Sequence, residues 1–225
     1  MPVADAPRER AFVRAHTRLT RVPYVPELRL HLAGGATGET GEMAGEMADE
    51  VYGLWERAGR LPFWAFAWAG GLALARHVLD HPCLVRDRTV LDLASGSGLV
   101  AIAAALAGAS AVTAAEVDPL AAAAIALNAA ANQAAVGVTL CDLLDGDGGE
   151  AEVVLAGDVF YEEPLARRVL PFLRRARARG ARVLVGDPGR AYLPRGRFTA
   201  VACQTVPTSR CLEDAEVKQV TIWRV

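Results

Sequence analysis

The sequence contains no long apolar segment. None of its runs approaches the roughly 18 consecutive apolar residues that a membrane-spanning helix needs. The first 20 residues mix arginine with Asp5 and Glu9, and they have no apolar core of signal-peptide length. We therefore expect a cytoplasmic protein without a membrane partner, with a transit peptide as the alternative.

Blocks of one charge sign and clustered cysteines are also missing. The 24 lysines and arginines nearly balance the 26 aspartates and glutamates, which gives a formal net charge of −2 and predicts no nucleic-acid partner. Cys83, Cys141, Cys203 and Cys211 show neither C-x-x-C spacing nor a nearby histidine cluster. This pattern predicts no metal site and four reduced, mostly buried thiols.

A length of 225 residues fits one large α/β domain. We expect residues 1–60 to form an N-terminal helical and extended addition that packs on the core, and residues 61–225 to form the core domain. Within the addition, alternating apolar residues over 28–32 predict a strand, residues 34–45 a loop, and residues 46–58 a helix.

Apolar strand patterns alternate with helical patterns through the rest of the chain. This order predicts a doubly wound, mostly parallel seven-stranded sheet that ends in an antiparallel C-terminal hairpin. The expected strands cover 89–93, 111–116, 136–140, 153–157, 182–186, 197–205 and 217–225. The expected helices cover 72–79, 98–107, 119–132 and 164–178, with Asp118 capping the third of these.

The most informative segment is Thr89-Val90-Leu91-Asp92-Leu93-Ala94-Ser95-Gly96-Ser97-Gly98-Leu99-Val100-Ala101, which predicts a strand, a glycine turn and a helix. Gly96 and Gly98 allow a ligand close to the backbone at a helix N-terminus. The spacing also satisfies the dinucleotide pattern G-x-G-x-x-A. Against a dinucleotide, the carboxylate of Asp92 would repel a pyrophosphate, whereas it suits a cofactor that carries an ammonium and a sulfonium. A turn that only joins a buried strand to a helix is the third interpretation.

Several other acidic residues follow predicted strands, at the sheet edge where ligands bind in such folds. Glu116 is the candidate acceptor for ribose hydroxyls. Asp142 could accept from an adenine amine or merely open a turn. Asn128, inside an alanine-rich helix, could serve the cofactor or bond to buried backbone.

Two further segments carry aromatic residues at short spacing. In Gly157-Asp158-Val159-Phe160-Tyr161, Asp158 could accept a hydrogen bond from an amine, and Phe160 or Tyr161 could form a wall for a cationic acceptor. Trp64 and Trp68 precede the glycine pair at residues 70–71 and predict either core packing or a lid over the cofactor.

These segments, together with Arg182-Val183-Leu184-Val185-Gly186-Asp187-Pro188-Gly189-Arg190, resemble the protein lysine methyltransferase family that modifies the β-subunit of electron transfer flavoprotein. The D-x-x-x-G-x-G spacing resembles motif I of class I methyltransferases, which have a Rossmann-like seven-stranded fold and use S-adenosylmethionine. The resemblance covers residues 50–190. It departs at Ala94, where many relatives have glycine, and at Glu116, where aspartate is usual.

The resemblance implies transfer of a methyl group to a lysine of the electron transfer flavoprotein β-subunit. It implies that Asp158 and Tyr161 are the catalytic residues, which orient the acceptor. The cofactor-binding residues are then Trp64, Trp68, Asp92, Ala94, Ser95, Gly96, Gly98, Glu116, Val117, Asn128, Asp142 and Asp158. A small-molecule N-methyltransferase is the alternative, followed by an NAD-dependent oxidoreductase and a non-catalytic flavoprotein-binding module.

Overall fold

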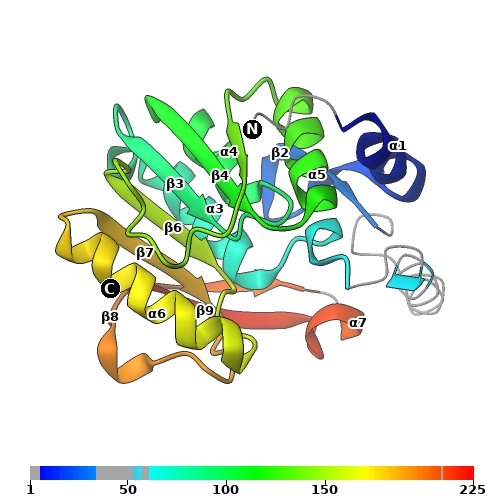
Figure 1. The fold of residues 1–225 in the computed structure, drawn as a ribbon. Coiled ribbons are helices and arrows are strands. Elements are labelled where there is room, and N and C mark those ends of the chain that lie inside the picture. The colour runs from blue at the N-terminus through cyan, green and yellow to red at the C-terminus, as the bar shows by residue number, and fades with distance from the viewer. Residues whose placement is uncertain (1–5, 34–52, 54, 57–60, 209) are drawn as a thin grey trace.

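A single seven-stranded sheet forms the centre of the computed structural model (Figure 1), which describes residues 6–33, 53, 55–56, 61–208 and 210–225. The strand order is β5-β4-β3-β6-β7-β9-β8. The five strands from β5 to β7 in this order pair in parallel. The last two form the β8–β9 hairpin, in which β9 is antiparallel to both of its neighbours, β7 and β8. The strands are β3 (Thr89–Leu93), β4 (Ala111–Glu116), β5 (Gly137–Leu140), β6 (Val153–Gly157), β7 (Arg182–Asp187), β8 (Thr199–Pro207) and β9 (Val217–Arg224). The predicted doubly wound α/β sheet with a C-terminal antiparallel hairpin is confirmed.

Both faces of the central strands are buried, because successive side chains point to opposite sides. In β6, Val153 and Leu155 belong to one core cluster, whereas Val154 and Ala156 belong to a second one. The first cluster lies under α3 (Ala69–Asp80), α4 (Leu99–Leu106) and α5 (Pro119–Ala131). The second lies under α6 (Glu163–Ala178) on the opposite face of the sheet (Figure 1).

The connection from β5 to β6 lacks a helix and is held by arginines of α6. Arg168 pairs with Asp142 at 2.6 Å and with Asp145 at 3.3 Å. About two turns further along α6, Arg175 donates to the carbonyl oxygens of Leu144 and Gly146. These contacts fix the backbone that leaves β5, and with it the position of Asp142.

The N-terminal segment packs on the same core as the sheet. Helix α1 (Pro7–His16) is followed by the antiparallel pair β1 (Arg18–Val22) and β2 (Val25–Leu32). Leu28 and Leu30 of β2 are fully buried in the cluster beneath α3, α4 and α5. The alternating segment at 28–32 is therefore a strand, as predicted, whereas its partner β1 was not predicted.

Some of the predictions concern residues outside the described part of the chain, and one is wrong. The loop predicted at 34–45, and all of the helix predicted at 46–58 except residues 53, 55 and 56, lie outside the described residues. The prediction of mostly buried cysteines is wrong, because the thiol-bearing residues Cys83, Cys141 and Cys203 are all exposed. Among the described residues, no helix is both long and apolar enough to cross a membrane, and no cluster of three potential metal ligands occurs.

Candidate active site

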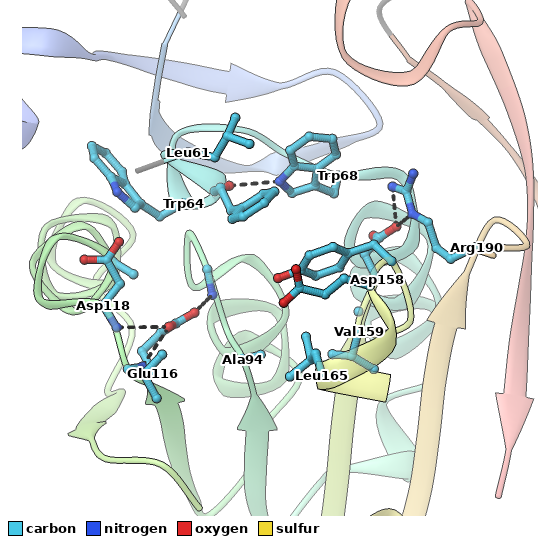
Figure 2. A pocket seen from close by; sticks show the side chains of 17 residues that line it. Leu61, Trp64, Trp68, Ala94, Glu116, Asp118, Asp158, Val159, Leu165 and Arg190 are labelled. Atoms are coloured by element: carbon cyan, nitrogen blue, oxygen red, sulfur yellow. Dashed lines mark hydrogen bonds and ion pairs between the residues drawn. The ribbon is translucent and has the colours of Figure 1, made fainter. Parts of the chain in front are cut away.

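A cavity of about 390 Å³ opens at the carboxyl ends of the parallel strands. Figure 2 shows Leu61, Trp64 and Trp68 on one side of it and Glu116, Ala94, Val159 and Leu165 on the other. Its lining comes from the segment before α3, the turn after β3, the start of α5 and the segments after β6 and β7. Eight predicted site residues meet in this lining, namely Trp64, Trp68, Ala94, Gly96, Glu116, Val117, Asp158 and Tyr161.

The turn after β3 is held by the carboxylate of Asp92. Asp92 Oδ2 accepts hydrogen bonds from Ser95 Oγ and, at 3.0 Å, from the Ala101 amide in the first turn of α4. The residue is 1% exposed, and burial raises the pKa of its carboxyl from 3.8 to about 7. Asp92 therefore shapes the turn from beneath and does not line the cavity.

Glu116 connects the turn to the end of β4. Its Oε1 accepts from the Gly96 amide at 2.7 Å, and its Oε2 accepts from the Val117 amide at 2.9 Å. Burial raises the pKa of Glu116, whereas these amides lower it. Oε2 also accepts from the Asp118 amide at 3.5 Å, whereas Oε1 accepts only from Gly96 among the described residues and keeps a lone pair for a ligand hydroxyl. Glu116 lines the cavity, and its role as the ribose acceptor stays a prediction.

Two observations show that the cavity suits a cofactor such as S-adenosylmethionine. Gly96 has φ +58°, and a Cβ built on it would meet nothing within 4 Å, so the backbone is open to a ligand. Trp64 is 1% exposed, and its indole Nε1 has no hydrogen-bond partner in the described part of the chain. A buried indole N–H needs an acceptor, which a polar cofactor bound in the cavity can provide.

Aromatic rings line the other end of the cavity. The ring centroids of Phe63 and Tyr161 are 5.1 Å apart, and those of Phe63 and Trp68 are 6.0 Å apart. Trp68 Nε1 donates to the Phe63 carbonyl oxygen at 2.9 Å, which fixes the indole at the start of α3. Burial raises the pKa of Tyr161 to about 12, so its hydroxyl stays protonated at neutral pH and is available as a hydrogen-bond donor.

Asp158 lines the same cavity and directly follows β6 (Figure 2). Its φ of +54° is a left-handed conformation that aspartate and asparagine tolerate better than most residues. Its Oδ2 accepts from the Gly71 amide at 2.9 Å, and its Oδ1 accepts from Arg190 Nη2 at 2.7 Å. Burial raises the pKa of Asp158 from 3.8 to about 6, against the opposing effect of Arg190.

Several predicted site residues lie outside the cavity lining. Asn128 is fully buried, where its Oδ1 accepts from the His31 amide and its Nδ2 donates to the Ser97 carbonyl. Asp142 accepts from the Leu144 amide at 3.0 Å and pairs with Arg168. Asn128 therefore bonds to buried backbone and Asp142 opens a turn, which are the structural alternatives considered for these two residues. Ser95 and Gly98 belong to the turn after β3, where Gly98 has φ +83° and packs over Ile125.

Sequence reasoning did not select Arg190 or Glu213 as site residues. Arg190 lines the cavity, and Glu213 pairs with it at 2.7 Å. The signal available for Arg190 was its place in the Gly-Asp-Pro-Gly-Arg segment after β7. Glu213 gave none, because it lies in a polar connection between two strands.

The fold and this cavity define a class I methyltransferase. A ribosomal protein L11 methylase from Lactobacillus delbrueckii subsp. bulgaricus superimposes with a TM-score of 0.52 and 21% identity, over 71% of this chain and 80% of that one. Magnesium protoporphyrin IX methyltransferase from Synechocystis PCC 6803, solved with bound SAH, superimposes with a TM-score of 0.50 and 17% identity, over 69% and 81%. At these identities, the likenesses establish the fold. A family model described as ribosomal protein L11 methyltransferase (PrmA) matches residues 73–159.

The particular family follows from relatives of higher identity. The electron transfer flavoprotein beta subunit lysine methyltransferase of Xenopus laevis is 38% identical over 81% of this chain and 71% of its own length. The human protein of the same name is 37% identical over 82% and 68%. The chain belongs to the electron transfer flavoprotein β-subunit lysine methyltransferase family.

Proposed function

We propose that this protein is an S-adenosylmethionine-dependent protein-lysine N-methyltransferase that acts on the electron transfer flavoprotein β-subunit. The relatives' names support the substrate, and the solved neighbour with bound SAH supports the cofactor. The observation that carries the proposal is the arrangement of Asp158 and three aromatic rings beside a turn that suits a nucleoside cofactor.

The cofactor supplies a methyl group from its sulfonium when bound. Glu116, Gly96, Val117 and Trp64, which line the cavity, would hold it. The acceptor nitrogen must first lose a proton, because an ammonium has no lone pair. With a free pKa of about 10.4, deprotonating a lysine at pH 7.4 costs roughly 4 kcal/mol.

Asp158 and Tyr161 would meet the acceptor amine at the far end of the cavity. Asp158 Oδ1 accepts two hydrogen bonds from Arg190, whereas Oδ2 accepts one from the Gly71 amide and keeps a lone pair, so Oδ2 can accept a hydrogen bond from the amine. The Tyr161 hydroxyl and the ring of Phe63 can hold the cationic form by hydrogen bonding and cation–π attraction. Their contribution is orientation and desolvation of the nitrogen, and the proton leaves to water.

The test is methylation of recombinant electron transfer flavoprotein with labelled S-adenosylmethionine, followed by peptide mass mapping. The matched control is Gly96→Arg, which places a long side chain in the open space next to the turn. The enzyme has a single lysine, Lys218, so label in its own band is easily assigned. Incorporation by the wild type and none by Gly96→Arg supports the proposal.

Two variants test the acceptor residues. Asp158→Asn and Tyr161→Phe are expected to reduce kcat by roughly tenfold or more, with little change in cofactor affinity measured by calorimetry. Asparagine suits the left-handed backbone at this position, so the change removes charge without adding backbone strain. Label that enters a protein-free metabolite extract but not the flavoprotein would instead support a small-molecule acceptor.

A further inference from the structure

Arg190 joins two carboxylates that come from different parts of the chain. Its Nε and Nη2 donate to Asp158 Oδ1 at 2.9 and 2.7 Å. Its Nη1 and Nη2 donate to the two oxygens of Glu213 at 2.9 and 2.7 Å. The side chains of Asp158 and Glu213 are 9% and 3% exposed, so these are charge-assisted bonds shielded from water.

The same two carboxylates bind the first turn of α3. Trp68, the N-cap residue, makes no capping bond with its side chain, which leaves the first amides of the helix to other partners. Glu213 Oε1 accepts from the Ala69 amide at 3.2 Å, and Asp158 Oδ2 accepts from the Gly71 amide at 2.9 Å. The start of α3 is therefore capped by groups from the end of β6 and from the connection between β8 and β9.

Glu213 is unusual among the acidic residues of that connection. It ends the four-residue helix α7 (Arg210–Glu213) and is 4% exposed, whereas Asp214 and Glu216 are exposed. Burying a carboxylate is unfavourable unless it is paired and hydrogen bonded. Glu213 is both, and all of its partners are groups next to the cavity.

We infer that Arg190 and Glu213 are positioning residues for methyl transfer, which hold Asp158 and the Trp68 end of α3 in a fixed relation across the acceptor end of the cavity. The inference rests on the proposed function for its reaction. It assigns the C-terminal hairpin a part in the site, through Glu213, in addition to its part in the sheet. Arg190 also lies 5.7 Å from the centre of the Trp68 ring, so it contacts both sides of the arrangement.

The charges around Asp158 give the inference a distinctive signature. Arg190 lowers the pKa of Asp158, whereas Glu213 and Asp187 raise it. Removal of Arg190 should therefore raise the pKa of Asp158, and removal of the Glu213 charge should lower it. A general loosening of the fold would instead shift the pKa of Asp158 in the same direction in both variants.

The experiment compares Glu213→Gln, Arg190→Gln and Arg190→Lys with the wild type. Glu216→Gln is the matched control, because Glu216 lies in the same connection and pairs with Arg210 where both side chains are at least 72% exposed. Methyl transfer to the flavoprotein is measured as kcat and KM against pH. Carbon-13 NMR of labelled aspartate carboxyls, assigned with Asp158→Asn, follows the titration of Asp158 without any acceptor.

We expect kcat to fall by about tenfold in Glu213→Gln and by more in Arg190→Gln, with the cofactor Kd within about threefold of wild type. The acid limb of kcat and the NMR titration should shift to lower pH in Glu213→Gln and to higher pH in Arg190→Gln. Arg190→Lys keeps the positive charge but loses the planar guanidinium. Its kcat should also fall, with a smaller shift in the titration of Asp158 than in Arg190→Gln. It also tests the inference if Arg190→Gln does not fold.

The inference is overturned if Glu213→Gln matches Glu216→Gln in kcat and in pH profile, or if Asp158 titrates as in the wild type in every variant. A different outcome tests the proposed function. If the wild type transfers no methyl group to the flavoprotein while the NMR shifts occur in opposite directions, the substrate is wrong and the positioning of Asp158 is supported.

Discussion

The two ends of the cavity are built in different ways. The proposed cofactor end consists of Asp92, Ala94, Gly96 and Glu116, and its carboxylates bond mainly to amides of the same strand–turn–helix unit and the next strand. The proposed acceptor end consists of Asp158, Arg190, Glu213 and the first turn of α3, and its carboxylates bond to a guanidinium and to amides up to 144 residues away in the chain. The cofactor end is therefore determined locally, whereas the acceptor end depends on how four separate segments pack.

The glycine pair at the start of α3 gives the largest expected difference. A Cβ at Gly70 would overlap the Gly186 carbonyl oxygen and lie 2.5 Å from Asp158 Oδ2, whereas a Cβ at Gly71 would come no closer than 3.7 Å to Leu99. We expect Gly70→Ala to lose about 3 kcal/mol or more of unfolding free energy, because backbone must move. Gly71→Ala should be tolerated or stabilising by up to about 1 kcal/mol, because alanine favours the helix.

Urea denaturation of both glycine variants measures this difference. Equal stability of the two variants would show that the backbone near Gly70 shifts at little energetic cost. The close packing of α3 on β6 and β7 would then not be what fixes the acceptor end.

The Glu116 carboxylate tests how far the cofactor end relies on backbone bonds. In Glu116→Gln, the new amide group would face an N–H donor of either Gly96 or Val117, so one hydrogen bond becomes a repulsion. We expect cofactor binding to weaken by roughly 10- to 100-fold in calorimetry. Glu152→Gln is the control, because that carboxylate also accepts from a strand amide, that of Thr89, but at an exposed position away from the cavity. Equal affinities in the two variants would remove Glu116 from the cofactor site.

This difference between the two ends also explains what was predictable from sequence. The elements at 89–93, 111–116 and 153–157 were predicted to the residue, because apolar runs bounded by turns carry their own signal. The turn with Gly96 and Glu116 was predicted for the same reason. The pairing of Glu213 with Arg190 was not, because Arg190 follows β7 and Glu213 follows β8, so their contact depends on how these segments pack. The pairing of Asp142 with Arg168, which lies 26 residues further on in α6, also depends on packing and was likewise not predicted.

Asp92 should give the cofactor end a pH-dependent stability. The pKa of its carboxyl is about 7 in the folded protein against 3.8 ordinarily, so the folded state binds more protons between these values. Its contribution to stability is complete below about pH 4 and is lost as pH rises through 7, at about 1.4 kcal/mol for each unit of raised pKa. Asp92→Asn removes this dependence while keeping a polar group for Ser95 and Ala101.

The stability of Asp92→Asn relative to wild type should thus increase from pH 5 to pH 8 in thermal denaturation. A constant difference across this range would mean that Asp92 ionises in the folded protein as it does in the unfolded chain. Asp142→Asn is a suitable control, because Arg168 lowers the pKa of that exposed carboxyl from its ordinary 3.8, so its stability relative to wild type should stay constant from pH 5 to pH 8.

The smallest expected effect concerns Ala94, which lines the cavity with φ +52°. A left-handed alanine costs about 1–2 kcal/mol, part of which glycine recovers despite its larger unfolded-state entropy. We expect Ala94→Gly to raise the free energy of unfolding by about 0.5–1 kcal/mol, measured by urea denaturation. Gln133→Gly is the matched control, since Gln133 has φ +54° in the turn after α5, away from the cavity. If only Gln133→Gly gains stability, the Ala94 methyl group makes packing contacts that outweigh its backbone strain. Side-chain packing then stabilises the cofactor end in addition to its backbone hydrogen bonds.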